Sequence, residues 1–224
     1  MNVSKLIKNT ILGGEFLTHA KSQDSKVLYY HDLFLEDRFP AYTSMATSFK
    51  SFQEHIKAIK DKGFVIVDKI TEPKRQVMLA FDDGWEGIYS FKDFFVSSKI
   101  FPTLSIPVAL IGLDGYLSKE QIKELFSVGF NFISHSWTHQ PVTIYNNNEN
   151  ALKRELLDSK KYLEDLLSNK IDAFCFPRGL YSRATYEKCM EYGYEEVFTC
   201  EAGNYSSEVF PRPKEGTLLR DAHY

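Results

Sequence analysis

The sequence contains few cysteines, and their number and spacing exclude a disulfide framework. Cys175, Cys189 and Cys200 are odd in number, and no two of them form a Cys-x-x-Cys pair. A small fold held together by disulfides is therefore not expected, and the pattern fits a reducing compartment.

Long apolar segments and an excess of charge are also missing. No run of about 18 apolar residues is present, and a Gly-Gly-Glu segment at 13–15 interrupts the apolar stretch near the N-terminus. We therefore expect no transmembrane segment and no signal peptide. This makes a cytoplasmic enzyme the default, although a trimmed leader would leave the same sequence. The formal net charge of −3 provides no basic footprint for nucleic acid.

The remaining composition is ordinary for one globular domain. The 224 residues suffice for one continuous core, with 43% hydrophobic and 25% charged residues. Aromatic residues are in excess at 15%, which places them in the core or, in part, along a sugar-binding cleft. No repeat or linker divides the chain, and nothing in it indicates an oligomeric state.

Short apolar segments alternate with longer amphipathic ones along nearly the whole chain. A helix is expected at about 149–168, where leucines recur on one face, and another from Ser118, which forms a capping-box pattern with Gln121. The segments expected as strands are rich in Val, Ile, Phe or Tyr and bounded by Gly, Pro or Asp. They are 27–30, 64–68, 77–81, 103–108, 130–135, 173–176 and 196–200.

This alternation predicts an α/β fold with parallel strands joined by helical crossovers. About seven such units favour a small or incomplete barrel, with a doubly wound open sheet as the alternative. In either architecture, functional groups gather at the C-terminal ends of the strands.

Two polar clusters follow expected strands in a way that suits a metal ion. Asp82 and Asp83 end one strand, and a cation can offset the repulsion between adjacent carboxylates, although Asp-Asp-Gly is also good turn chemistry. His135 and His139 follow another strand at a spacing from which two imidazoles can converge on one ion, although such a pair is often a surface accident. Together with Asp83 they form a set that leaves coordination positions open, as a catalytic metal requires.

A third cluster ends the strand at 173–176. Pro177 and Gly179 flank Arg178, so that the backbone turns sharply there and can direct a main-chain N–H into a cleft. Read alone, this segment is a tight turn between a strand and a helix.

The three clusters together resemble the polysaccharide deacetylase family, also described by NodB homology or as carbohydrate esterase family 4. Residues 82–84 (Asp-Asp-Gly) match its first motif, 135–139 (His-Ser-x-x-His) its second, and 177–179 (Pro-x-Gly) the end of its third. The resemblance covers about 27–215. It implies a distorted (β/α)7 barrel of NodB type and one catalytic domain over residues 1–224.

The resemblance also implies roles for individual residues. Asp83, His135 and His139 would bind the metal, typically zinc, with cobalt, nickel or manganese as alternatives. Asp82 would be the general base toward a water of lowered pKa. The backbone N–H of Arg178 would complete an oxyanion site.

The acid that protonates the leaving amine is expected to be His31. It follows a hydrophobic strand and precedes Asp32, a possible electrostatic partner. This arrangement resembles the poly-N-acetylglucosamine deacetylase branch, in which the acid histidine lies on the first strand. The alternative is His223, next to the chain end.

The third motif departs from the family pattern. Where many members have an arginine that orients the base, this chain has Cys175, and a thiol cannot replace a bidentate guanidinium. Either Arg178 or Arg212 would then orient the base, or the base is less well oriented. We favour Arg212. A nucleophilic role for Cys175 is disfavoured, because a cysteine inside an apolar strand is usually packing.

The predicted function is metal-dependent removal of N-acetyl groups from an amino sugar, in a poly- or oligosaccharide or its precursor. The expected partner is thus an N-acetylated carbohydrate. One alternative is hydrolysis of another bond, such as a cyclic amide or an O-acetyl ester, on the same scaffold. Another is a non-catalytic carbohydrate-binding relative.

Overall fold

The computed structural model describes residues 23–199 and 220–221, apart from residues 38, 39, 41, 42 and 44. Cys200, Arg212 and His223 lie outside the described residues, so the sequence-based roles of Arg212 and His223 have no structural counterpart here. The single domain over residues 1–224 likewise stays a prediction. Among the helices that are described, none has the length and apolar character needed to cross a membrane.

The fold is built on one parallel sheet in which successive strands lie side by side. Its order is β10-β1-β5-β6-β7-β8-β9, and β4 shares the edge of β5 with β6. A separate two-stranded sheet pairs β2 with β3. The strand bounds are β1 Lys26–Tyr30, β2 Asp32–Phe34, β3 Ala46–Ser48, β4 Val65–Val67, β5 Gln76–Phe81, β6 Thr103–Ile106, β7 Asn131–Ser134, β8 Ala173–Cys175, β9 Glu196–Phe198 and β10 Arg220–Asp221.

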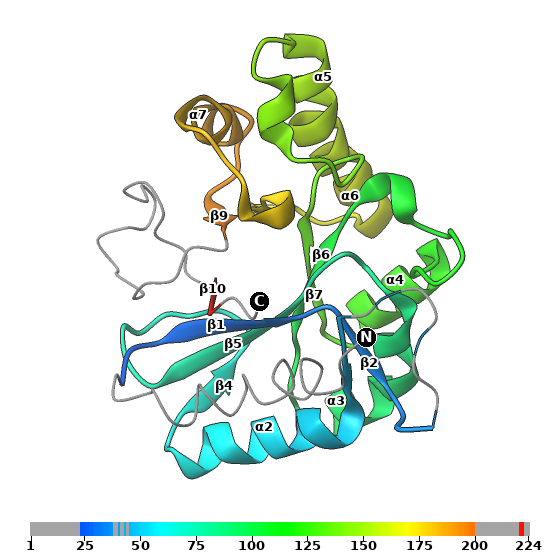
Figure 1. Cartoon of the computed structure of the whole chain (residues 1–224), viewed down its shortest axis with the longest axis vertical. Coiled ribbons are helices and arrows are strands. Elements are labelled where there is room, and N and C mark those ends of the chain that lie inside the picture. Colours follow the sequence, from blue (N-terminus) through cyan, green and yellow to red (C-terminus); the bar gives the residue numbers. More distant parts are fainter. Residues whose placement is uncertain (1–22, 38–39, 41–42, 44, 200–219, 222–224) are drawn as a thin grey trace, which may run out of the picture.

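The order of the strands explains why the sheet curls. From β5 to β9 each strand is added beside the previous one in the same direction, without the reversal that makes a doubly wound sheet. The crossovers therefore fall on one face and form an arc of helices around the strands (Figure 1). Within the described residues, β9 and β10 are the two ends of the strand order. The predicted incomplete barrel is confirmed, and the doubly wound alternative is wrong.

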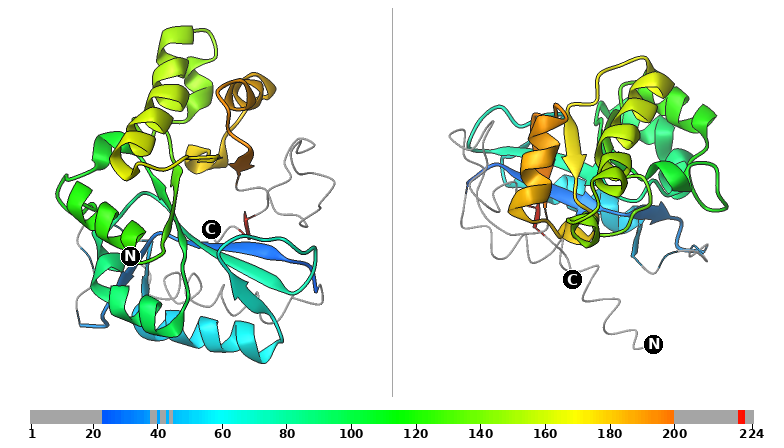
Figure 2. Two further views of the ribbon diagram at one scale, coloured as in Figure 1. Left: turned by 180° about the vertical axis from the view of Figure 1, so that it is seen from behind. Right: turned by 90° about the horizontal axis from the view of Figure 1, so that it is seen from above.

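Each short 3-10 segment lies between a strand and the helix that follows it. Figure 2 shows the same arc of helices from behind and from above. The predicted helix at about 149–168 is present, but a π-helical turn at its centre divides it. The predicted capping box is also present, since the Ser118 and Gln121 side chains each accept from the other residue's backbone N–H. The helix bounds are α2 Phe49–Asp61, η1 Glu86–Phe91, α3 Lys92–Ser98, η2 Val108–Leu110, α4 Lys119–Ser127, η3 Val142–Tyr145, α5 Glu149–Lys153, η4 Arg154–Asp158 (the π turn), α6 Ser159–Leu167, η5 Pro177–Gly179 and α7 Arg183–Glu191.

The two faces of the sheet carry different cores, because successive side chains of a strand point to opposite faces. On β5, for example, Leu79 and Phe81 pack outward into the large core beneath the helices, whereas Ala80 packs inward. The inward residues form a smaller cluster inside the half-barrel. It comprises Val27, Tyr29, Ile70, Met78, Ala80, Ile133, Ala173, Cys175 and Phe198.

Candidate metal centre

The candidate site continues the inner face of the sheet beyond the ends of the strands. Two residues after the inward Ala80, the same alternation directs Asp82 inward, and two residues after Ile133 it directs His135 inward. Asp82, His135 and the inward Cys175 are each at most 4% exposed, and their ligand atoms lie within 4.8 Å of one another. Strands far apart in the sequence thus deliver their polar groups to one place.

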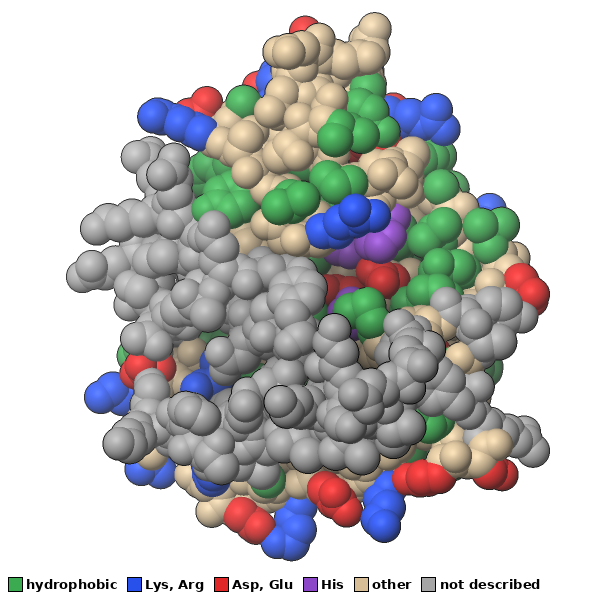
Figure 3. Space-filling view, viewed as in Figure 1, with side chains coloured by type: hydrophobic (Ala, Val, Ile, Leu, Met, Phe, Trp, Pro, Cys, Tyr) green, Lys and Arg blue, Asp and Glu red, His purple; other side chains and the backbone are tan. Residues whose placement is uncertain are grey.

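Asp83 brings the two predicted metal-binding histidines together. Its Oδ1 lies 3.3 Å from Nε2 of His135 and 2.9 Å from Nε2 of His139. Ligand atoms around a tetrahedral zinc ion are about 3.3 Å apart, as follows from metal–ligand distances near 2.0–2.1 Å. One carboxylate oxygen and two imidazole nitrogens at these separations therefore fit a divalent ion. Figure 3 shows acidic and histidine side chains together in a hollow of this face, beside a Lys or Arg side chain.

The backbone of this region is held in a conformation that few residues adopt. Seven non-glycine residues of the described chain have positive φ, and four of these belong to the second and third motifs or to Asp83 itself. A left-handed residue costs about 1–2 kcal/mol, and such strain clusters at functional sites. Here the left-handed residues turn the backbone sharply in the segments that follow β5, β7 and β8. The four are Asp83 (φ 72°), Ser136 (φ 69°), His139 (φ 64°) and Arg178 (φ 58°).

Charge within the set favours an ionised Asp83. Burial alone would raise the pKa of this carboxyl, but hydrogen bonds from His135 and His139 more than offset it and hold the pKa well below its ordinary value. For His139, burial lowers the pKa, and the Asp83 carboxylate outweighs burial, so that the net shift is upward. A metal ligand must be deprotonated, and Asp83 meets that condition over the whole neutral range.

Cys175 contacts both the predicted base and a predicted ligand. Its backbone carbonyl accepts a hydrogen bond from Nδ1 of His135 at 2.8 Å, which leaves Nε2 facing Asp83. Its thiol lies 4.0 Å from Oδ1 of Asp82. The position where the family pattern led us to look for a base-orienting arginine is thus held by a fully buried thiol beside Asp82.

His31 follows β1, and the structure places it within electrostatic reach of the candidate metal ligands. Its ring packs edge-on against Tyr29, with centroids 5.7 Å apart, and its charge contributes to lowering the pKa of Asp83. The residue that follows points elsewhere. Asp32 accepts hydrogen bonds from the backbone N–H groups of Leu33, Gly87 and Ile88, so its partnership with His31 stays a prediction.

Asp32, the first residue of β2, is buried against the first residues of η1. Burial raises the pKa of its carboxyl to about 7, against the opposing effect of the backbone N–H groups it accepts from. A side chain at Gly87 would collide with it, because an added Cβ would lie 2.3 Å from Asp32 Oδ1. Asp32 therefore ties the segment after His31 to the segment after Asp83.

Arg178 lies at the rim of the site. Its side chain is exposed, and its charge acts on His139, whose pKa it lowers slightly against the effect of Asp83. The structure therefore keeps Arg178 near the candidate metal centre. Its predicted role through the backbone N–H is not tested by this geometry.

Two residues that support the site were missed in the sequence. Trp85 donates from Nε1 to Oδ2 of Asp83 at 3.3 Å. Glu155, which is 2% exposed, extends from the π turn to the second motif and accepts from the backbone N–H groups of Trp137 and Thr138 at 3.0 and 2.9 Å. The sequence did contain a signal for Glu155, because an acidic residue next to Leu156 lies on the apolar face of the predicted helix.

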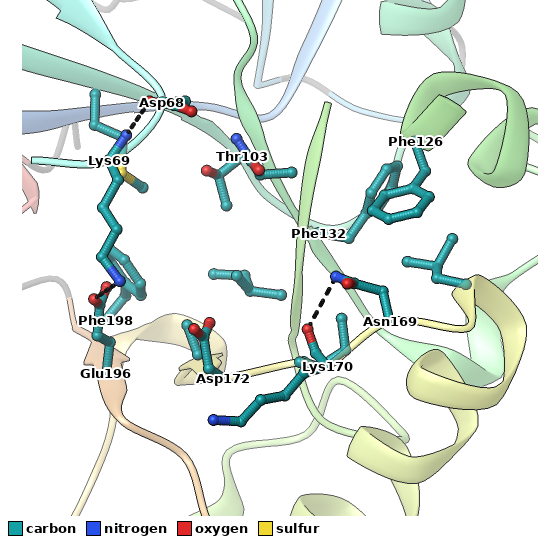
Figure 4. A pocket seen from close by; sticks show the side chains of 16 residues that line it. Asp68, Lys69, Thr103, Phe126, Phe132, Asn169, Lys170, Asp172, Glu196 and Phe198 are labelled. Carbon is teal, nitrogen blue, oxygen red and sulfur yellow. Dashed lines mark hydrogen bonds and ion pairs between the residues drawn. The ribbon is translucent and has the colours of Figure 1, made fainter. Parts of the chain in front are cut away.

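A cavity of about 250 Å³ lies at the other end of the half-barrel, where strands β6 to β9 begin (Figure 4). Lys69 and Glu196 form an ion pair of 2.6 Å on its wall. None of the predicted site residues lines this cavity. It is therefore separate from the candidate metal centre.

Comparison with known proteins yields a family model and sequence relatives. A protein-family model described as polysaccharide deacetylase matches residues 69–197. YxkH of Bacillus subtilis (strain 168), whose name assigns it provisionally to the polysaccharide deacetylases, is 24% identical over 197 residues, which are 81% of this chain and 66% of YxkH. An uncharacterized 30.6 kDa protein of Geobacillus stearothermophilus is 27% identical over 56% of this chain and 46% of its own. The chain thus spans about two thirds or less of these relatives.

The fold is shared with solved structures, among them PplD and IcaB. The Streptococcus pyogenes deacetylase PplD, in complex with acetate, matches with a TM-score of 0.72 at 21% identity over 88% of this chain and 89% of its own. IcaB from Ammonifex degensii matches with a TM-score of 0.69 at 21% identity over 88% of this chain and 92% of its own. At these identities the likeness establishes the half-barrel architecture.

Proposed function

Because this chain belongs to the polysaccharide deacetylase family, we propose that it is a metal-dependent hydrolase that removes N-acetyl groups from an amino sugar. The substrate would be a poly- or oligosaccharide or its precursor. The single observation that carries the proposal is the convergence of Asp83, His135 and His139, with a second carboxylate, Asp82, buried next to them.

The donor set and its exposure suit a catalytic ion. Two imidazoles and one carboxylate are the ligands of many catalytic zinc sites, with cobalt, nickel and manganese as alternatives. The His135 side chain is only 3% exposed, whereas that of His139 is 28% exposed. A substrate would therefore approach from the His139 side.

Each polar group at the strand ends then has a task in amide hydrolysis. A bound divalent ion would polarise the acetyl carbonyl and lower the pKa of the attacking water. Asp82 would take the proton of that water, and the backbone N–H of Arg178 would face the oxygen that gains negative charge. His31 would give a proton to the amine nitrogen as the C–N bond breaks, which yields acetate and a free amino sugar.

Two features of other proteins support this choice of reaction. The structure of PplD holds acetate, which is the acid released by deacetylation. The family model is described as polysaccharide deacetylase, which names the removal of acetyl groups from a polysaccharide. Acetyl ester or cyclic amide hydrolysis would use the same ion and base, and a carbohydrate-binding relative would need no base beside a metal.

The test is acetate release by the full chain after chelation and reloading with zinc, cobalt, nickel or manganese. N-acetylglucosamine oligomers should release acetate, and O-acetyl sugars and cyclic amides should react more slowly. Asp82→Asn should keep the metal but lose nearly all turnover. The control is Asp93→Asn, at an exposed aspartate, which should keep both the metal and turnover. Near-normal turnover of Asp82→Asn would exclude Asp82 as the base. A wild-type chain that binds no metal would overturn the proposal.

The acid is tested separately. His31→Ala should lower turnover while the metal stays bound, because His31 is not one of the three proposed ligands. An unchanged rate would shift the role to His223.

A further inference from the structure

Trp85 lies two residues after Asp83 and its side chain turns back toward that carboxylate. Nε1 of the indole donates to Oδ2 of Asp83 at 3.3 Å, while Oδ1 of the same carboxylate faces His139 at 2.9 Å. The two oxygens of Asp83 therefore have different partners, one the indole and the other the two imidazoles.

The indole ring is itself held in place by Tyr116. The two rings stack with centroids 4.3 Å apart and planes 21° apart, on a stretch where residues 85 and 116 form an antiparallel bridge. Two backbone hydrogen bonds of 2.9 Å flank the bridge, from the N–H of Glu86 to the carbonyl of Gly115 and from the N–H of Leu117 to the carbonyl of Gly84. Trp85 thus has little freedom to swing away from Asp83.

We propose that Trp85 is a positioning residue that fixes the orientation of Asp83 toward the divalent ion, an inference that rests on the proposed metal site. The terminal torsion of an aspartate is broad, so an unrestrained carboxylate samples many orientations. The hydrogen bond to Oδ2 restricts this torsion and leaves Oδ1 directed at the position between the two imidazoles. Groups that hold metal ligands in this way typically contribute about 10–100-fold to metal affinity.

The experiment measures the zinc dissociation constant of the full chain by competition with a chromophoric chelator. Trp85→Phe removes the N–H but keeps an aromatic ring on Tyr116, and it should weaken zinc binding about tenfold or more. Tyr116→Phe keeps the ring that stacks on Trp85, so the indole stays in place. The zinc dissociation constant should then remain within about twofold of the wild type. Tyr116→Ala frees the indole and should fall between these values.

Folding of each variant is checked by thermal unfolding of the metal-free chain, and Trp85→Tyr is the second variant if Trp85→Phe does not fold. Zinc binding of Trp85→Phe equal to that of the wild type, together with loss of zinc in His139→Ala, would overturn the role of Trp85 and leave the metal site standing. A wild-type chain without zinc affinity would overturn the proposed function and this inference with it.

Discussion

Nδ1 of His135 donates a hydrogen bond of 2.8 Å to the backbone carbonyl of Cys175, so that β8 orients the ring that β7 delivers. The thiol of the same cysteine lies 4.0 Å from Asp82. Cys175 therefore supports the proposed ligand His135 through its backbone carbonyl, which a substitution of the side chain leaves in place. It supports the proposed base Asp82 through its thiol, which a substitution removes.

Because these two contacts are made by different parts of the residue, Cys175→Ala should lower kcat without releasing the metal. Loss of one weak hydrogen bond to the base corresponds to about 0.5–1.5 kcal/mol, or roughly 2–12-fold in rate. Cys175→Ser should recover part of the rate, because a hydroxyl can donate to Asp82. Steady-state kinetics and zinc titration check this, with the buried Cys189→Ala as control. Equal losses in both alanine variants would point to packing alone.

Glu155 should affect both stability and metal binding, because its carboxylate holds the backbone of the second motif. Glu155→Ala leaves the N–H groups of Trp137 and Thr138 without this acceptor and should lower the free energy of unfolding by about 2–3 kcal/mol. Zinc affinity should fall as well, since His139 belongs to the loosened segment. Urea denaturation and zinc titration measure the two effects. The exposed Lys153→Ala, at the end of α5 just before the π turn, should change neither.

The buried carboxyl of Asp32 makes stability depend on pH. Its pKa is raised from 3.8 to about 7, so the folded state favours the protonated form more than the unfolded state does. The contribution of Asp32 to the free energy of unfolding is therefore fully present below about pH 4, and it is lost as pH rises through 7. The wild type should thus lose roughly 4 kcal/mol relative to Asp32→Asn between pH 4 and 8. Urea denaturation of both chains across this range measures the difference, and a difference independent of pH would contradict the assignment.

Gly87→Ala should destabilise the fold through a collision rather than through backbone strain. An added Cβ would lie 2.3 Å from Asp32 Oδ1 and 2.4 Å from the carbonyl oxygen of Leu33, which should lower the free energy of unfolding by about 1–3 kcal/mol. In an Asp32→Ala background the loss should shrink, because one of the two obstacles is gone. Gly112→Ala, where the new Cβ meets nothing within 4 Å, gives the effect of positive φ alone. Equal losses at both glycines would argue against the collision.

The sequence predicted the strands well because alternation of side chains is a local property. All seven predicted strands are present, most with one or two fewer residues at an end, and the expectation that polar groups gather beyond their C-terminal ends is confirmed for residues 82, 83, 135 and 139. The position of Asp82 next to Ala80 on the inner face follows from the same period of two.

The support of the site could not be predicted, since it depends on contacts between distant segments. Glu155 is 18 residues from Trp137, and it reaches the second motif from a π turn that no local pattern announces. Trp85 is close to Asp83 in sequence, but its position depends on Tyr116, 31 residues further along the chain. The proximity of the Cys175 thiol to Asp82 likewise requires the register of β5 to β8.

The alternation of side chains along the strands limits where the chain can gain or lose residues. A single residue inserted within β5 or β7 would turn Asp82 or His135 away from the interior and toward the helices, and no replacement of a side chain would reverse this. Segments that connect a helix to the next strand can grow or shrink without moving these groups. Length changes among relatives should therefore concentrate between the strands, while the two-residue step from Ala80 to Asp82 and from Ile133 to His135 stays constant.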